Sequence, residues 1–99
     1  MPIVYVVQES THNIEPAREY GRIRVMLMHS EVQEGNDKIS RVLERELKDI
    51  HSEDYILCIG DPVAIGIAIH FALVKTRGKI NVLTWDKKHY LYEESTIEL

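Results

Sequence analysis

Two short segments, 8–13 and 60–63, carry the side chains whose types and spacing best suit ligand binding. The first supplies hydroxyls, an imidazole and an amide. The second supplies a turn glycine, then Asp61 as a helix N-cap and Pro62 at the first helical position. Backbone N–H groups at such a helix start favour an anion. The residues predicted to bind a small anionic or nucleotide ligand are Ser10, Thr11, His12, Asn13, Gly60, Asp61 and Val63.

Segment 60–63 also fits a plain capped turn that binds nothing, and two observations favour that alternative. The chain has neither the GxGxxG nor the GxxxxGK[ST] motif of common nucleotide sites. The Asp61 carboxylate would repel an anion if it faced the ligand. His12 is the candidate general acid–base, because an imidazole exchanges protons near neutral pH; the alternative is an exposed loop histidine. The five histidines show no HxH or HExxH spacing, so we expect no metal and no cofactor.

Charge and cysteine content limit the classes of partner and compartment. A net charge of −4 over 99 residues argues against nucleic-acid binding, which needs a basic surface. The single cysteine, Cys58, lies in an apolar run, so we expect an inert buried thiol, no intrachain disulfide and a reducing, cytoplasmic setting. The longest apolar run, 63–69, is far shorter than the ~20 residues of a membrane span. No basic region precedes the first apolar run, as it would in a signal peptide.

Apolar runs and helical spacing predict alternating strands and helices along the chain. Strands are expected at 3–7, 22–28, 56–59, 79–85 and 89–93. Helices are expected at 14–20, from a cap at Asn36 or Asp37 to about residue 50, and at 62–75. The segments expected to lack regular structure are the polar loops 8–13 and 29–35 and a loose tail, 94–99.

This alternation is typical of an α/β protein with a mostly parallel sheet, helices on both faces and a C-terminal antiparallel hairpin. We expect one domain over 1–99, a small three-layer Rossmann-like or flavodoxin-like fold. The expected sheet places the first and third strands side by side, flanked by the second and fourth. Ligands of such sheets bind at the carboxyl ends of the strands where the strand order reverses. That rule brings segments 8–13 and 60–63 together.

The helix predicted at 62–75 carries two different faces. Ala64, Ala68 and Ala72 form a stripe of small side chains that favours close packing on the sheet. The opposite face is too apolar for free solvent, so either another part of the chain covers it or it forms the contact of a symmetric homodimer. The residues predicted for this interface are Val63, Gly66, Ile67, His70 and Val74.

Three aromatic residues, Trp85, Tyr90 and Tyr92, lie on the predicted terminal hairpin. They suit cross-strand pairs that stabilise an edge of the sheet. Stacking on a base and anchoring of a protein partner are the alternatives.

The segments IGDPVAIGIA and NVLTWDKKHYLY give the chain a family resemblance. Together with the IVYVVQE start, they resemble short uncharacterised proteins encoded by bacteriophages, and the resemblance spans most of the chain. It implies a small accessory protein made in the infected cell and supplies no activity or catalytic residue.

The sequence favours a non-enzymatic, dimeric binding module that acts in the bacterial cytoplasm. The module would bind a bacterial host protein, or it would sequester a small anionic ligand. The alternative is a small nucleotide- or phosphate-handling enzyme with His12 as acid–base, Ser10 and Thr11 as donors and the backbone of 60–63 holding the anion. A structural component of the virion is a third alternative.

Overall fold

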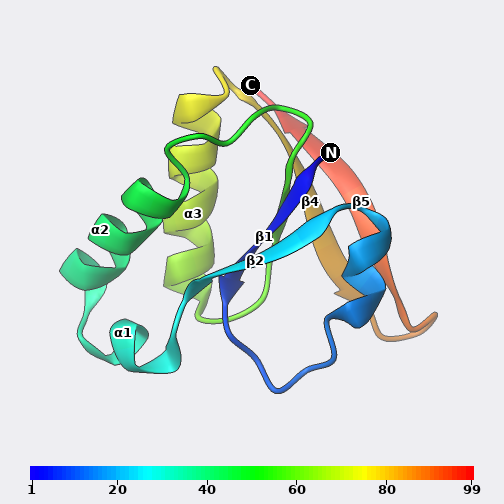
Figure 1. Ribbon diagram of the computed structural model, residues 1–99, viewed down its shortest axis with the longest axis horizontal. Coiled ribbons are helices and arrows are strands. Elements are labelled where there is room, and N and C mark those ends of the chain that lie inside the picture. The colour runs from blue at the N-terminus through cyan, green and yellow to red at the C-terminus, as the bar shows by residue number, and fades with distance from the viewer.

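Five strands form one sheet in the computed structural model, which describes residues 1–99 (Figure 1). The strands are β1 (Ile3–Gln8), β2 (Arg22–Leu27), β3 (Tyr55–Leu57), β4 (Lys79–Asp86) and β5 (Leu91–Glu98). Their order in the sheet is β2-β1-β3-β4-β5. The first four run parallel, and β5 pairs antiparallel with β4. This arrangement confirms the α/β class, the adjacent first and third strands and the terminal hairpin.

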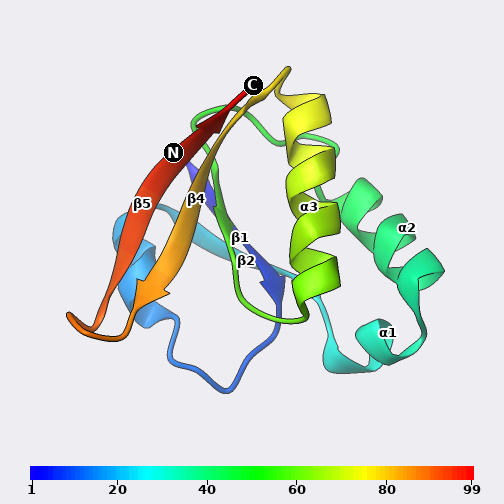
Figure 2. The same cartoon turned by 180° about the vertical axis from the view of Figure 1, so that it is seen from behind.

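The helices divide between the two faces of the sheet. They are η1 (Glu15–Glu19, a 3₁₀ helix), α1 (His29–Gln33), α2 (Asn36–Glu46) and α3 (Pro62–Lys75). Helices α2 and α3 pack side by side on one face, whereas η1 lies on the other (Figures 1 and 2). The expected helix at 14–20 is therefore a single short 3₁₀ element. None of the helices reaches the length and hydrophobicity that crossing a bilayer requires.

The larger of two apolar cores lies between the sheet and helices α2 and α3. Ala64, Ala68 and Ala72 have no exposed surface, which confirms the prediction that this stripe is closely packed. A smaller core on the opposite face includes Ala17 of η1 and Tyr92 of β5. The sheet is thus covered on both faces, as its almost uninterrupted apolar strands predict.

The segment 29–35 is not a loop throughout, as the sequence predicted, because residues 29–33 form α1. The backbone N–H of Met28, just before α1, donates to the Glu31 carboxylate at 2.9 Å. The N-cap of α2 is Gly35 rather than Asn36 or Asp37, and no side chain caps this helix. Gly35 has a φ of +101°, a conformation that glycine adopts at little cost.

The C-terminal tail is not loose, because β5 extends to Glu98 as the outermost strand of the sheet. Lys79 of β4 pairs with Glu98, and the N–H of Leu99 donates to the carbonyl of Gly78 at 2.8 Å. A polar sequence forms this strand because pairing uses backbone groups, which every residue but proline supplies in full.

Candidate functional site

A cleft of about 760 Å³ lies at the carboxyl ends of β1 and β3, where the strand order of the sheet reverses. This is the place that the sequence predicted for a ligand. Only one of its eight lining residues, Val32, is hydrophobic, and α1 closes one side. The lining residues are Gln8, Glu9, Ser10, Thr11, His29, Val32, Gly60 and Asp61.

The structure brings together some of the predicted ligand-binding residues and separates others. Ser10, Thr11, Gly60 and Asp61 line the cleft. The remaining three (His12, Asn13 and Val63) are not among its lining residues.

Those three residues have other surroundings. The His12 ring meets the Trp85 ring edge-on, with centroids 4.9 Å apart, and the His12 N–H donates to Ser10 Oγ at 3.0 Å. Asn13 Oδ1 accepts from the N–H of Glu15 at 3.0 Å, at the start of η1. Val63 is exposed on α3. His12 therefore lies on the aromatic side of the loop rather than in the cleft wall.

The turn from β3 into α3 has the local structure that its sequence predicts. Gly60 has a φ of +121°, and a Cβ at that position would lie 2.5 Å from Gln8 Cβ. The Asp61 carboxylate accepts from the N–H of Ala64 at 3.0 Å, and Pro62 begins the helix. Glycine is required here for both conformation and space.

Gln8 is the main polar residue that the sequence analysis did not identify. It was assigned to a polar loop, but it is the last residue of β1 and only 5% exposed. Its Oε1 accepts from the N–H of Asp61 at 2.8 Å, and its Nε2 donates to His29 Nδ1 at 3.1 Å. One buried amide thus connects β1, the turn before α3 and the start of α1. The position of Gln8 directly after an apolar strand was the available indication.

Glu9 connects the end of β1 to the end of β2 and to the start of α1. Its N–H donates to the carbonyl of Leu27 at 2.8 Å, and its carboxylate accepts from the N–H of His29. The cleft therefore contains two carboxylates, those of Glu9 and Asp61, and neither lysine nor arginine. His29 and Val32 also lay outside the sequence prediction, because α1 was not expected. Glu9 lies in the predicted segment 8–13 but was not named as a ligand-binding residue.

Cys58 follows β3 and is only partly buried. Burial raises the pKa of its thiol, which keeps the sulfur protonated and weakly nucleophilic near neutral pH. No three His, Cys, Asp or Glu side chains come together in a way that would hold a metal ion.

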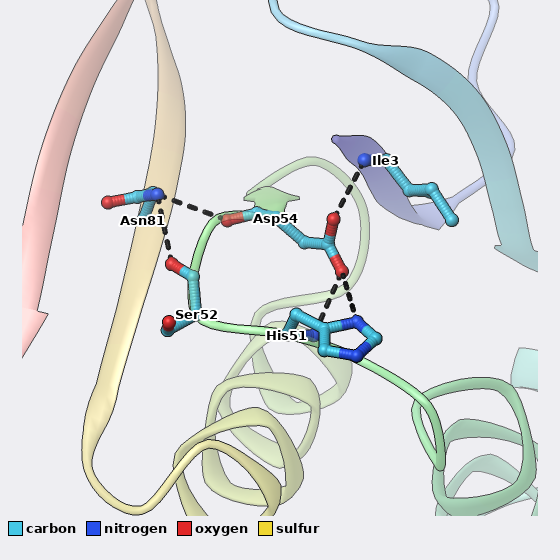
Figure 3. Close-up of polar contacts among 5 residues, drawn as sticks. All are labelled: Ile3, His51, Ser52, Asp54 and Asn81. Carbon is cyan, nitrogen blue, oxygen red and sulfur yellow. Dashed lines mark hydrogen bonds and ion pairs between the residues drawn. The ribbon is translucent and has the colours of Figure 1, made fainter. Parts of the chain in front are cut away.

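A second polar cluster lies at the amino ends of the strands, around Asp54 (Figure 3). The buried Asp54 carboxylate accepts from the N–H groups of Ile3 and His51, each at 2.9 Å. The Asn81 side chain donates to the carbonyls of Ser52 and Asp54 at 3.2 and 3.3 Å. These contacts satisfy backbone groups of the chain itself, so this cluster organises the fold.

The outer face of α3 is not covered by any other part of the chain. Val63 and Val74 are 52% and 60% exposed, and no atom lies within 4 Å of a Cβ placed on Gly66. His70 is exposed and Ile67 is partly exposed on the same face. The alternative that another part of the chain covers this face is therefore wrong.

Trp85 and Tyr92 form the predicted cross-strand aromatic pair. They are paired residues of β4 and β5, with ring centroids 4.9 Å apart. Tyr92 is buried, whereas Tyr90 is 79% exposed.

A family model described as phage Pam3 gp32-like protein matches residues 2–99. No curated protein and no solved structure matches the chain.

Proposed function

We propose that this chain, which belongs to the phage Pam3 gp32-like protein family, is a non-enzymatic module that binds and sequesters a small polar molecule. The supporting observation is the cleft of about 760 Å³ at the carboxyl ends of β1 and β3. Its volume falls within the range of small-molecule sites, roughly 300–1,000 Å³. Buried Gln8 also holds three of the surrounding elements in place before any ligand arrives.

The charges around the cleft favour a neutral or cationic ligand with hydroxyl or amino groups. Glu9 and Asp61 provide carboxylate acceptors, and Ser10 and Thr11 provide hydroxyls. An anion would face these carboxylates without a basic side chain in the wall. The nearby helix N–H groups of His29 and Ala64 already donate to carboxylates of the chain. These charges argue against the anionic ligand that the sequence suggested.

The position of His12 supports binding over catalysis. The enzyme alternative used His12 as its general acid–base, which must reach the proton that it transfers. His12 instead packs on Trp85, outside the cleft lining. His29 is the imidazole in the wall, and its Nδ1 is occupied by Gln8.

The exposed α3 face supports a second binding partner, a protein, beside the small molecule in the cleft. This partner stays a prediction. A second copy of this chain is the occupant that we favour, and a bacterial host protein is the alternative. The proposed setting is the cytoplasm of the infected bacterium, which is consistent with the free thiol of Cys58.

The first experiment is native mass spectrometry of gently purified protein, followed by denaturation and analysis of released molecules. Backbone NMR titrations then use defined probes: adenosine, spermidine and inorganic phosphate. We expect adenosine or spermidine to shift the signals of Ser10, Thr11 and Gly60, and phosphate to shift none of them.

Two variants test whether binding occurs in the cleft. Thr11→Trp places a bulky ring at the cleft wall and is expected to abolish the shifts. Thr84→Trp makes the same change at an exposed residue of β4 outside the cleft lining and is expected to keep them. Unchanged binding by Thr11→Trp would contradict the assigned site. If the native protein releases no molecule on denaturation and binds none of the probes, the proposed function is contradicted.

A further inference from the structure

Two hydrogen bonds of the Gln8 side chain together restrict where His29 can carry its proton. Gln8 Oε1 lies 2.8 Å from the backbone nitrogen of Asp61, and Gln8 Nε2 lies 3.1 Å from His29 Nδ1. A backbone N–H can only donate, so the amide oxygen of Gln8 must face Asp61. The amide nitrogen must then face His29. Because that nitrogen also only donates, Nδ1 has to accept and cannot carry a proton.

The Gln8 side chain has no room to reverse this arrangement. It is 5% exposed, and its residue pairs with Leu27 at the end of β1. A Cβ on Gly60 would lie 2.6 Å from Gln8 Oε1, so the turn passes directly over the amide. A flipped amide would set two donors against each other at Asp61 and leave a buried N–H without an acceptor.

We propose that Gln8 selects, for the neutral His29 ring, the tautomer protonated on Nε2, so that the cleft offers a ligand an imidazole N–H donor. Nε2 is the ring nitrogen that Gln8 leaves free. Carboxylates of Glu9 and Asp61, in the same wall, accept from donors of the ligand. A cleft with this N–H donor and these carboxylate acceptors selects a neutral molecule that carries a hydrogen-bond acceptor beside donor groups. An amide and the edge of a nucleobase have this pattern. This assignment of ligand class rests on the proposed function, whereas the tautomer does not.

The tautomer is measured without any ligand, by long-range ¹H–¹⁵N NMR of the His29 ring at alkaline pH. In the native protein we expect the pattern of a ring protonated on Nε2. In Gln8→Glu, one carboxylate oxygen still accepts from Asp61 and the other becomes an acceptor for His29. We therefore expect the proton of the neutral ring to move to Nδ1. Gln8→Leu, which removes both polar atoms, is the control and should give a mixture of the two forms.

Two results would overturn the proposal: a native ring protonated on Nδ1, or a folded Gln8→Glu protein whose ring keeps the native pattern. If Gln8→Glu does not fold, the native spectrum still decides, and His12 supplies an internal reference because its ring has no such contact with Gln8.

The ligand class is tested separately with adenosine as the probe. We expect Gln8→Glu to weaken adenosine binding by about 10-fold or more, because the donor at Nε2 is lost. Ser10→Ala should weaken it less. If adenosine does not bind the native protein while the tautomer is as expected, the nucleobase-edge ligand class is wrong and the role of Gln8 stands.

Discussion

The Asp54 carboxylate lies 2.9 Å from the backbone nitrogen of Ile3, a residue 51 positions earlier in the chain. This contact joins the start of β1 to the segment that enters β3. The second carboxylate oxygen accepts from the N–H of His51, also at 2.9 Å. One buried side chain thereby satisfies a backbone N–H at the start of β1 and another in the segment that leads into β3.

Replacing Asp54 by asparagine should destabilise the fold by about 1–3 kcal/mol, because the amide has one acceptor oxygen and would leave a buried N–H unpaired. The measurement is urea unfolding followed by circular dichroism. Asp49→Asn, at an exposed position, is the control and should change the free energy of unfolding by less than about 0.5 kcal/mol. Equal stabilities of the two variants would contradict a structural role for Asp54.

Two glycine-to-alanine changes should shift stability in opposite directions. Gly60→Ala should destabilise by roughly 1–3 kcal/mol, because the residue has a φ of +121° and its new Cβ would meet Gln8. Gly66→Ala should stabilise by roughly 0.5–1 kcal/mol, because Gly66 lies inside α3 with open space beside it. Thermal and urea unfolding measure both. A Gly60→Ala protein as stable as the native one would show that the turn tolerates a side chain.

Gly66→Arg tests whether a second copy covers the outer face of α3. A long charged side chain in the middle of that face should weaken a dimer by tenfold or more, an effect of about 1.4 kcal/mol or greater. Sedimentation velocity over a concentration series measures the association. Glu44→Arg, at an exposed position of α2, is the control and should leave the association unchanged. A native protein that stays monomeric at every concentration would contradict the homodimer.

The turn between β4 and β5 should loosen in acid. A hydrogen bond from the His89 ring, and others from the N–H groups of His89 and Lys88, hold the pKa of Asp86 below its usual value. A carboxyl whose pKa is lower in the folded chain stabilises it above the unfolded pKa, near 3.8, and loses that contribution as the pH falls through the folded value.

Amide hydrogen exchange at Lys88 and His89 measures this loss as the pH falls below about 4, after correction for the intrinsic pH dependence of exchange. Asp86→Asn should show increased opening already at neutral pH, with little further change in acid. A corrected exchange profile of the native protein that is flat across this range would rule out the contribution of Asp86.

The parts of the fold that depend on local sequence could be predicted from the sequence. The run before Gly60, its turn conformation and the start of α3 at Pro62 follow from neighbouring residues. Apolar residues at helical spacing likewise identified the buried face of α2, which includes Ile39, Val42 and Leu43. The residues that specify each of these elements lie close to it in the sequence.

The parts that depend on distant contacts could not be predicted. Helix α1 is short and has no apolar periodicity, and the N–H of His29 finds its acceptor on Glu9, 20 residues earlier. The pairing of Gln8 with His29 spans 21 residues and exists only once β1, α1 and α3 have assembled. A cleft lies where the strand order predicted a ligand site, but half of its lining residues were not among the predicted ones.

The outer position of β5 has a consequence for how copies of this protein meet at high concentration. An edge strand presents unpaired backbone groups that can recruit the edge of another molecule and start open-ended aggregation. Glu93, Glu94 and Glu98 are all exposed along this edge, so an approaching second β5 would bring like charges together. Electrostatic repulsion between these carboxylates thus opposes edge-to-edge pairing of two β5 strands.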